Sequence, residues 1–419
     1  MASVSSSSSP TASRPIRFEG LAGIRFLAAM GVVLYHFFDL SDALPGSTSP
    51  PEEPRWAVDI LSRYLPGLRL GFLAVDFFFI LSGFVLAHVY FRQIEQGIYS
   101  HAQFLKKRFA RIYPLHLAMT LLLAIVVVIG QSYDVRINHA ENFSFAGFLL
   151  NAFLANGLNI IPNLTWNGPS WCVSSEWQAY LAFPIVALLV LKAPGKGYVA
   201  LAFALALFGI AYYYVPSPPL LTQRTYDWGT LRLAVEFPIG LALYRVYRDY
   251  VRAKCEFIDA RHVWGALFLT FCAFQLRADE WLIVLLLATS LFVLAAAETY
   301  RPTPVLSHPW MVYGGEISYA IYLVHIPFLV CVRKVYLRLG AAPGSFAECC
   351  ADLAAVAFVV PVAALAYRVI EAPAYRRTLQ LLDKGAGVSS AGGVSAGSQH
   401  VNASLQHEAV QTHSASKPE

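Results

Sequence analysis

Long apolar segments separated by short polar ones dominate the chain. A helix needs about twenty mostly apolar residues to cross the ~30 Å hydrocarbon core of a bilayer, and the chain holds about ten segments of roughly that kind. They are Phe18–Leu40, Leu70–Phe91, Tyr113–Gly130, Ser175–Leu191, Tyr198–Val215, Leu231–Val246, His262–Leu276, Trp281–Ala297, Ile317–Tyr336 and Asp352–Ile370. This pattern predicts an all-α fold, a polytopic helical membrane protein with about ten transmembrane helices.

One further apolar stretch, Phe143–Ile161, is interrupted by Asn151, Asn156 and Asn159. Because amides are unfavourable against lipid, we expect this segment to lie in the membrane interface or to re-enter it. If it crossed the membrane, every later loop would change sides.

The basic residues support ten crossings. With the N-terminus in the cytoplasm, most Lys and Arg residues flank inside ends, including those in Lys106–Arg111 and Arg245–Arg261. Cytoplasmic loops of membrane proteins carry such an excess. One loop dissents, since Arg333, Lys334 and Arg338 would lie outside. We therefore expect a multi-pass protein of the cell membrane with both termini in the cytoplasm.

Composition agrees with a membrane protein, because 57% of the residues are hydrophobic and only 14% are charged. A net charge of +5, sorted by membrane side, does not indicate a nucleic-acid partner. The six cysteines form no C-x-x-C pair, so we expect no metal site and treat them as packing residues. Residues 1–15 and 381–419 are rich in Ser, Gly and Ala, and we expect disordered tails around one transmembrane domain at 16–380.

Ionisable groups inside the spans need an explanation, since each costs at least ~2.5 kcal/mol to insert. Arg25 and His36 are eleven residues apart in the first span, which places them on one helix face about 16 Å apart along the axis. An Arg reaching to the interface and a hydrogen-bonded His explain this pair equally well.

Asp76 is the acid of the second span and is expected to pair with Arg25; Ser82 and Gly83 after it allow close helix contact. Arg108 and Arg111 share a helix face at the cytoplasmic entrance of the third span. Two guanidinium groups suit phosphate oxygens, although the positive-inside bias also explains them.

Two later segments carry polar groups at the membrane. At the outer start of the fourth span, Ser174 or Ser175 suits an N-cap and Glu176 suits the first turn, so this segment is either a helix start or a site. The ninth span contains Ser318, Tyr319, Tyr322 and His325, with His325 two turns beyond Ser318. For Glu236 and Glu371 we favour a role at a kink or a helix end.

In this order, the segments resemble the acyltransferase-3 family of integral-membrane O-acyltransferases. The resemblance covers about Phe18 to Arg377. It rests on these matches: the basic-x10-His pair Arg25 and His36, the segment GFLAVDFFFILSGF around Asp76, the R-x-x-R-I-x-P motif at Arg108, Arg111 and Pro114, Trp171 through Glu176, and Ser318 through Pro327. Cys172 departs from the Ser that is usual in the family.

The resemblance implies an enzyme that takes an acyl group, usually acetyl, from cytoplasmic acyl-CoA and passes it to a hydroxyl on the far side of the membrane. The expected acceptor is a surface glycan or lipid-linked saccharide, and acyl-CoA is a donor substrate rather than a permanently bound cofactor. No appended hydrolase-like domain is expected, so transfer would be completed in the membrane domain or by a partner. The competing hypotheses are a transporter or channel that uses the same ionisable groups, and a structural protein.

Each candidate residue has an expected role. Arg25, Arg108 and Arg111 would hold the phosphates of the donor. His36 would act as base or as acyl carrier, and the sequence leaves direct transfer and an acyl-histidine intermediate both open. Glu176 would orient the acceptor or support His36, and Asp76 would fix Arg25. The expected acceptor-binding residues are Trp171, Ser174, Tyr319 and His325.

Overall fold

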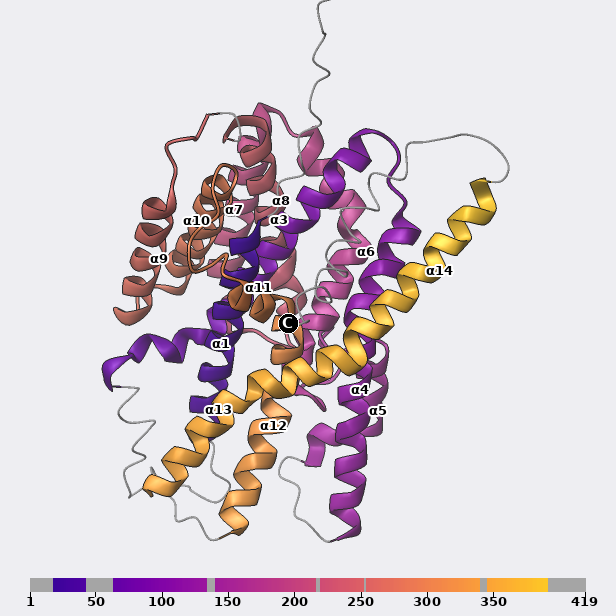
Figure 1. The fold of residues 1–419 in the computed structure, drawn as a ribbon, viewed down its shortest axis with the longest axis vertical. Coiled ribbons are helices and arrows are strands. Elements are labelled where there is room, and N and C mark those ends of the chain that lie inside the picture. The colour runs from indigo at the N-terminus through magenta and orange to yellow at the C-terminus, as the bar shows by residue number, and fades with distance from the viewer. Residues whose placement is uncertain are drawn as a thin grey trace, which may run out of the picture.

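The computed structural model describes residues 18–42, 63–133, 140–215, 219–251, 254–339 and 345–390. Helices and the turns between them account for all of these residues, which confirms the all-α fold (Figure 1). Residues 1–15, expected to be a tail, and the part of 381–419 after Ser390 lie outside the described residues. The last helix continues to Ser390, ten residues past the position where the sequence pattern placed the end of the domain.

The helices follow one another along the chain with short connections. Their bounds are α1 Glu19–Asp42, the 3-10 helix η1 Pro66–Leu73, α3 Ala74–Glu95, α4 His101–Ser132, α5 Phe145–Ala152, α6 Trp171–Lys192, α7 Tyr198–Tyr214, α8 Gly229–Val246, α9 Ala260–Gln275, α10 Glu280–Glu298, α11 Pro309–Glu316, α12 Ser318–Arg338, α13 Phe346–Ala366, the π-helix η7 Tyr367–Glu371 and α14 Ala372–Ser390.

Each of the ten predicted spans falls on a helix, but not every helix is long and apolar enough to cross a membrane. Among the described residues seven helical segments meet both conditions. The helices α7 and α9 have 17 and 16 residues and rise only about 25 Å. Helix α8 carries Arg232, Glu236 and Arg245. The structure therefore supports a multi-pass membrane protein with seven candidate spans.

The segment Phe143–Ile161 does not cross the membrane as one helix. Its helix α5 has eight residues, which rise about 12 Å, and irregular turns follow. Asn151 lies fully buried, and its amide nitrogen donates to the hydroxyl of Thr165 at 2.8 Å. Asn156 likewise donates to the hydroxyl of Ser170 at 2.9 Å, so two of the three amides that interrupt the apolar pattern contact the protein, while Asn159 is exposed.

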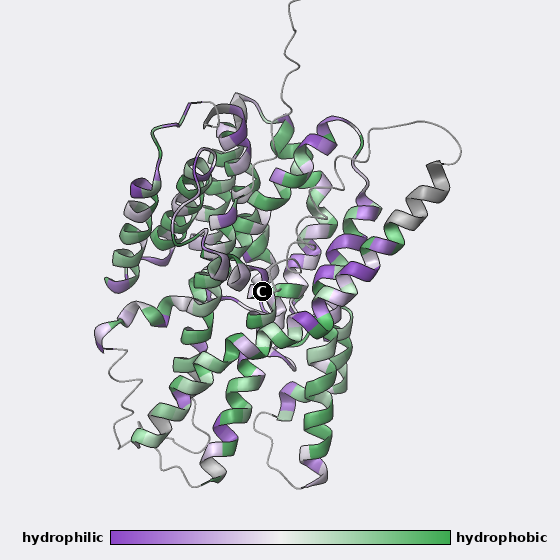
Figure 2. Ribbon diagram, viewed as in Figure 1, coloured by the Kyte–Doolittle hydropathy of each residue, from purple (hydrophilic) through white to green (hydrophobic). Residues whose placement is uncertain are grey.

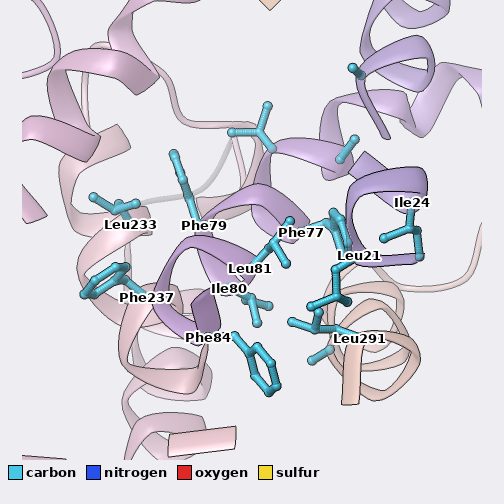
Figure 3. Close-up of a cluster of buried hydrophobic side chains, with 14 of the residues drawn as sticks. Leu21, Ile24, Phe77, Phe79, Ile80, Leu81, Phe84, Leu233, Phe237 and Leu291 are labelled. Carbon is cyan, nitrogen blue, oxygen red and sulfur yellow. The ribbon is translucent and has the colours of Figure 1, made fainter. Parts of the chain in front are cut away.

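Close packing of α3 against α8 forms the centre of the bundle. A Cβ atom on Gly240 would lie 1.9 Å from the carbonyl oxygen of Ile80, and one on Gly83 would lie 2.2 Å from that of Phe237. Only glycine allows the two backbones to approach this closely, so the predicted contact at Gly83 is confirmed. Figure 3 shows buried apolar side chains beside this contact, including Phe84, Ile80 and Phe237.

A buried carboxylate anchors the start of α1, the helix that carries Arg25 and His36. The side chain of Glu298, at the end of α10, accepts the backbone N–H of Gly20 at 2.7 and 2.9 Å and the hydroxyl of Ser307 at 2.8 Å. The first N–H groups of a helix have no partner within the helix. Glu298 supplies one and places negative charge at the positive end of the helix dipole.

The C-terminal helices form a long diagonal across the bundle in Figure 1, where α13 continues through η7 into α14. Figure 2 shows that α13 is mostly apolar, whereas α14 carries many polar residues. A π-helical turn inside an α-helix often marks a functional site. In this protein it ends at Glu371.

Candidate active site

Two histidines from distant parts of the chain face each other. The ring centroids of His36, on α1, and His325, on α12, are 5.2 Å apart with the planes inclined by 37°. The side chain of His325 is fully buried, and its Nδ1 lies 3.2 Å from the carbonyl oxygen of Ile321. A carbonyl only accepts, so Nδ1 carries the proton in this bond and Nε2 remains an acceptor. Among the described residues, Nε2 has no hydrogen-bond partner.

The segment that precedes α6 is tied to the helix that carries His325. The hydroxyl of Tyr322 donates to the carbonyl of Pro169 at 3.0 Å, and the amide nitrogen of Asn167 donates to the carbonyl of Leu323 at 3.0 Å. The ring of Tyr322 lies 5.8 Å from that of His325. These bonds bring the start of α6 to the histidine pair.

Trp171 opens α6 and covers a buried ion pair. Its indole packs 5.7 Å from the guanidinium of Arg232 on α8, and its side chain is nearly fully buried. A Cβ on Gly229 would lie 2.4 Å from this indole, so a glycine is needed there. Trp171 therefore packs against α8, and its expected contact with an acceptor stays a prediction.

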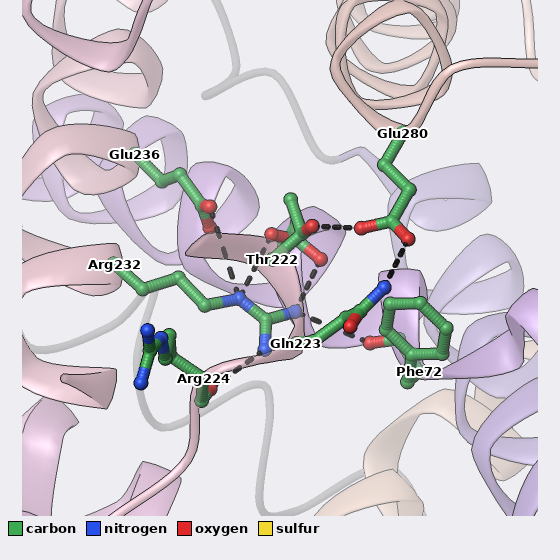
Figure 4. Close-up of polar contacts among 8 residues, drawn as sticks. Phe72, Thr222, Gln223, Arg224, Arg232, Glu236 and Glu280 are labelled. Carbon is green, nitrogen blue, oxygen red and sulfur yellow. Dashed lines mark hydrogen bonds and ion pairs between the residues drawn. The ribbon is translucent and has the colours of Figure 1, made fainter. Parts of the chain in front are cut away.

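Asp76 does not pair with Arg25, as the sequence suggested. Both carboxylate oxygens of Asp76 are engaged by Arg232, with Nε 2.9 Å from Oδ1 and Nη2 in contact with Oδ2. Figure 4 shows the guanidinium also donating to the carbonyls of Phe72 and Arg224. The expected role of Asp76 in fixing Arg25 is corrected: it holds α3 to α8.

Sequence reasoning missed Arg232, although a charge within the predicted span Leu231–Val246 was a sufficient signal. Arg232 has a second acidic partner, because the fully buried Glu236 lies 3.9 Å from the Arg232 Nε. Pro238 lies inside the same helix, two residues after Glu236, and the predicted role of Glu236 at a kink stays a prediction. Figure 4 places a second acidic centre nearby, where Glu280 accepts from Gln223 at 2.6 Å.

Glu176 lies inside α6 and has partners within the bundle. Its Oε1 accepts from the hydroxyl of Ser82 at 3.0 Å and from the hydroxyl of Tyr180. These contacts hold Glu176 toward α3 and along α6, and its expected roles, orienting the acceptor or supporting His36, stay predictions.

The N-cap prediction for Ser174 and Ser175 is wrong, because α6 begins three residues earlier, at Trp171. The Ser174 hydroxyl donates to the carbonyl of Leu154 at 2.6 Å and accepts from the N–H of Gly157 at 3.1 Å. The structure gives Ser174 this structural role, clamping the turn after α5 onto α6, in place of the expected contact with an acceptor.

The three predicted phosphate ligands differ in their surroundings. The guanidinium of Arg108 lies 5.9 Å from the rings of both Tyr90 and Phe104, and its buried Nε has no hydrogen-bond partner among the described residues. Arg111 instead pairs with the buried carboxylate of Glu371 and donates to the carbonyl of Glu316 at 3.2 Å. Glu371 was expected to act at a kink or a helix end. It lies at the end of η7, and it is also the ion-pair partner of Arg111.

Arg25 and Tyr319 lie near Arg111 and Glu371. Arg25 lies close enough to Glu371 for its charge to act on that carboxylate, so α1, α4 and η7 meet at one acid. The Tyr319 hydroxyl donates to the carbonyl of Ile112 at 2.5 Å, and its ring lies within electrostatic reach of both Glu371 and Glu176. Tyr319 therefore lies between Glu371 and Glu176, whereas His325, on the same helix, faces His36.

Among the described residues, no three His, Cys, Asp or Glu side chains converge as metal ligands would. The candidate site has two parts. The basic end consists of Arg25, Arg108 and Arg111, and the other part is the facing pair His36 and His325. Helix α1 connects them, because Arg25 and His36 lie on its same face, about 16 Å apart along its axis.

Comparison with known proteins identifies a family and several relatives. Residues 18–368 match a family described as an acyltransferase domain. The chain is 26% identical to "Acyltransferase MdmB" of Streptomyces mycarofaciens over 87% of this chain and 93% of that protein. It is 35% identical to "Protein 2 in picA locus" of Rhizobium radiobacter over 40% of this chain and 78% of that protein.

A third relative, from Staphylococcus aureus strain COL, bears a name that assigns it provisionally as an O-acetyltransferase. It is 21% identical over 87% of this chain, which spans 58% of that protein's length. No solved structure matches this chain.

Proposed function

Because this chain belongs to the acyltransferase-3 family of membrane acyltransferases, we propose that it transfers an acetyl group from cytoplasmic acetyl-CoA to a hydroxyl of an extracytoplasmic glycan or lipid-linked saccharide. The enzyme class follows from the family. The donor, the acceptor and the direction of transfer are the proposal, and the facing pair His36 and His325 is the observation that carries it.

The basic end is the proposed donor site. Arg108 has a buried Nε without a partner among the described residues, which suits a phosphate more than it suits a structural ion pair; the rings of Tyr90 and Phe104 beside it are themselves buried and position the guanidinium. Arg111 and Arg25 converge on Glu371, so they hold the wall of this site and add positive charge to it. A pantetheine arm bound beside α1 would bring its thioester toward His36, since about 16 Å along the helix axis separates Arg25 from His36.

The histidine pair is the proposed catalytic centre. His36 removes the proton from the acceptor hydroxyl as that oxygen attacks the thioester carbonyl, and the C–S bond breaks as the C–O bond forms. The thiolate of CoA then takes the proton from the imidazolium. The unpartnered Nε2 of His325 would accept a hydrogen bond from the ring N–H of His36 and fix its orientation. If His36 attacks first, an acyl-histidine forms and the same acceptor oxygen resolves it.

The relatives support an oxygen acceptor, because one bears a name that assigns O-acetyl transfer.

The proposed topology has ten crossings with both termini in the cytoplasm. It places Arg108 and Arg111 on the inner side; α6 begins further out at Trp171, about 9 Å along the helix axis from Trp177, whose ring packs 5.7 Å from that of Phe109. Helix α8, with its charged residues, is then a crossing that the bundle shields by packing, whereas α7 and α9 expose apolar side chains such as Phe203 and Phe268, 65% and 63% exposed, to lipid.

Proteoliposomes test the proposal directly. Purified enzyme is reconstituted with acetyl-CoA on one side only, and release of free CoA thiol is measured with and without saccharide acceptors on the other side. We expect acceptor-dependent release from wild type and none above background from His36→Ala. An acceptor-dependent rate in His36→Ala equal to that of wild type would refute the proposed catalytic centre.

A further inference from the structure

An open groove lies on the outside of the bundle, where α4, α6 and α14 meet. It has a volume of about 310 Å³ and is lined by Leu105, Lys106, Phe109, Ala110, Trp177 and Thr378. The indole of Trp177 and the ring of Phe109 form its wall, with centroids 5.7 Å apart. We call it the α4/α14 groove.

The groove is separate from the proposed donor site, although both use the first turns of α4. At about 100° per residue, the groove residues Leu105–Lys106 and Phe109–Ala110 centre about 200° around the helix from Arg108 and Arg111. The two arginines face the bundle interior and Glu371, so the groove faces outward.

Its surroundings are apolar and exposed. On α4, beyond Phe109 and away from Lys106, the positions Leu121, Ile125 and Ile129 form a stripe and are 45%, 56% and 53% exposed. In a membrane protein such a stripe contacts lipid chains. The groove therefore opens onto the hydrocarbon region rather than onto water.

One rim of the groove is basic. The side chain of Lys106 is exposed and forms no ion pair with a carboxylate of the described residues. On α14, Arg377 immediately precedes the lining residue Thr378 and is exposed. A basic cluster beside a lipid-facing wall is the pattern that binds anionic headgroups.

We propose that the α4/α14 groove binds an anionic phospholipid, with the phosphate at Lys106 and an acyl chain against Phe109 and Trp177. Arg377 adds charge at the rim, so the lipid also holds the amphipathic α14 against α4. This site does not depend on the proposed donor, acceptor or catalytic residues.

Brominated lipids quench tryptophan fluorescence on contact, and Trp177 lies in the groove. The protein is reconstituted in vesicles of brominated phosphatidylglycerol or of brominated phosphatidylcholine, and the Trp177 signal is obtained by subtracting the Trp177→Phe variant. We expect at least threefold stronger quenching of this signal by the anionic lipid. Lys106→Gln should abolish the difference, whereas Lys107→Gln, the neighbouring lysine outside the groove, should retain it.

Equal quenching by the two lipids in wild type would overturn the proposal, as would an equal loss of preference in the two lysine variants. Acetyl-CoA is added as a further arm. If it relieves the quenching, the groove belongs to the donor and not to a lipid; if quenching is unchanged, the lipid site stands apart from the donor site.

Discussion

The rings of His36 and His325 face each other at 5.2 Å, although one lies on the first long helix of the chain and the other on α12. The pair is formed by tertiary packing alone, and His325 is held by its bond to the carbonyl of Ile321. We therefore expect the two histidines to contribute unequally, with His36 in contact with the reacting atoms and His325 as a positioning residue.

Substitution of His36 by Ala should lower kcat by about 10²- to 10⁴-fold, the usual contribution of a general base. His325→Ala should lower kcat less and leave the KM for acetyl-CoA unchanged, because its ring acts through His36. Initial rates of CoA release, normalised to folded protein by size-exclusion chromatography, provide the measurement. A larger loss in His325→Ala than in His36→Ala would reverse the two assignments.

Arg108→Ala should raise the KM for acetyl-CoA at least tenfold, since the proposed partner is a phosphate. Arg108→Lys should rescue only part of this loss, because a single ammonium cannot reproduce the planar fork. The measurement is the KM for acetyl-CoA and for acetyl-3′-dephospho-CoA in each variant. Identical ratios of the two KM values in wild type and both variants would show that Arg108 does not contact the 3′-phosphate.

The ion pair of Arg232 and Asp76 should behave as a buried pair. Removing one partner, as in Asp76→Ala, leaves Arg232 with only the more distant Glu236 and should cost up to about 3–5 kcal/mol of stability. The double variant Asp76→Leu with Arg232→Met should lose less than the sum of the two single losses, since apolar side chains of similar size often replace a buried pair without penalty, although Glu236 then loses its partner. Thermal unfolding in detergent measures both effects. Additive losses in the double variant would contradict the pairing.

The carboxylate of Glu298 should stabilise the start of α1. Glu298→Ala removes the acceptor of the Gly20 N–H and of the Ser307 hydroxyl, and we expect a loss of about 1–3 kcal/mol. The matched control is Glu95→Ala, which removes an exposed partner of Arg248 at 2.9 Å and should cost no more than about 1 kcal/mol. Detergent unfolding of the two variants at one pH makes the comparison, and equal losses would contradict the anchoring role.

Membrane sidedness can be measured with two single cysteines. Gln103, at the start of α4, is exposed and should be cytoplasmic; Ile160, between α5 and α6, is 61% exposed and should be extracytoplasmic. Asn167 is unsuitable because it is buried. In a background without Cys331, Cys350 and the remaining thiols, an impermeant maleimide should label Ile160→Cys in intact cells and Gln103→Cys only after lysis. The reverse labelling would invert the proposed direction of transfer.

Much of the fold follows from local pattern. Apolar length predicts the long apolar helices but not the polar helix α14, because a segment in lipid must satisfy its own backbone hydrogen bonds and helices do so internally. The same reasoning separates Phe143–Ile161 from the crossing helices, and helical periodicity places Arg25 and His36 on one face. These are properties of single segments, so the sequence by itself determines them.

Which charges meet was decided by tertiary structure. Asp76 pairs with Arg232 rather than with Arg25, and Glu371 with Arg111, because helix order around the bundle depends on close contacts such as Gly83 against Phe237 and Gly240 against Ile80. An ion pair needs two helices in register, and no periodicity within one helix contains that information. The sequence therefore determined which groups lie at membrane depth, and the packing of the helices decided their partners.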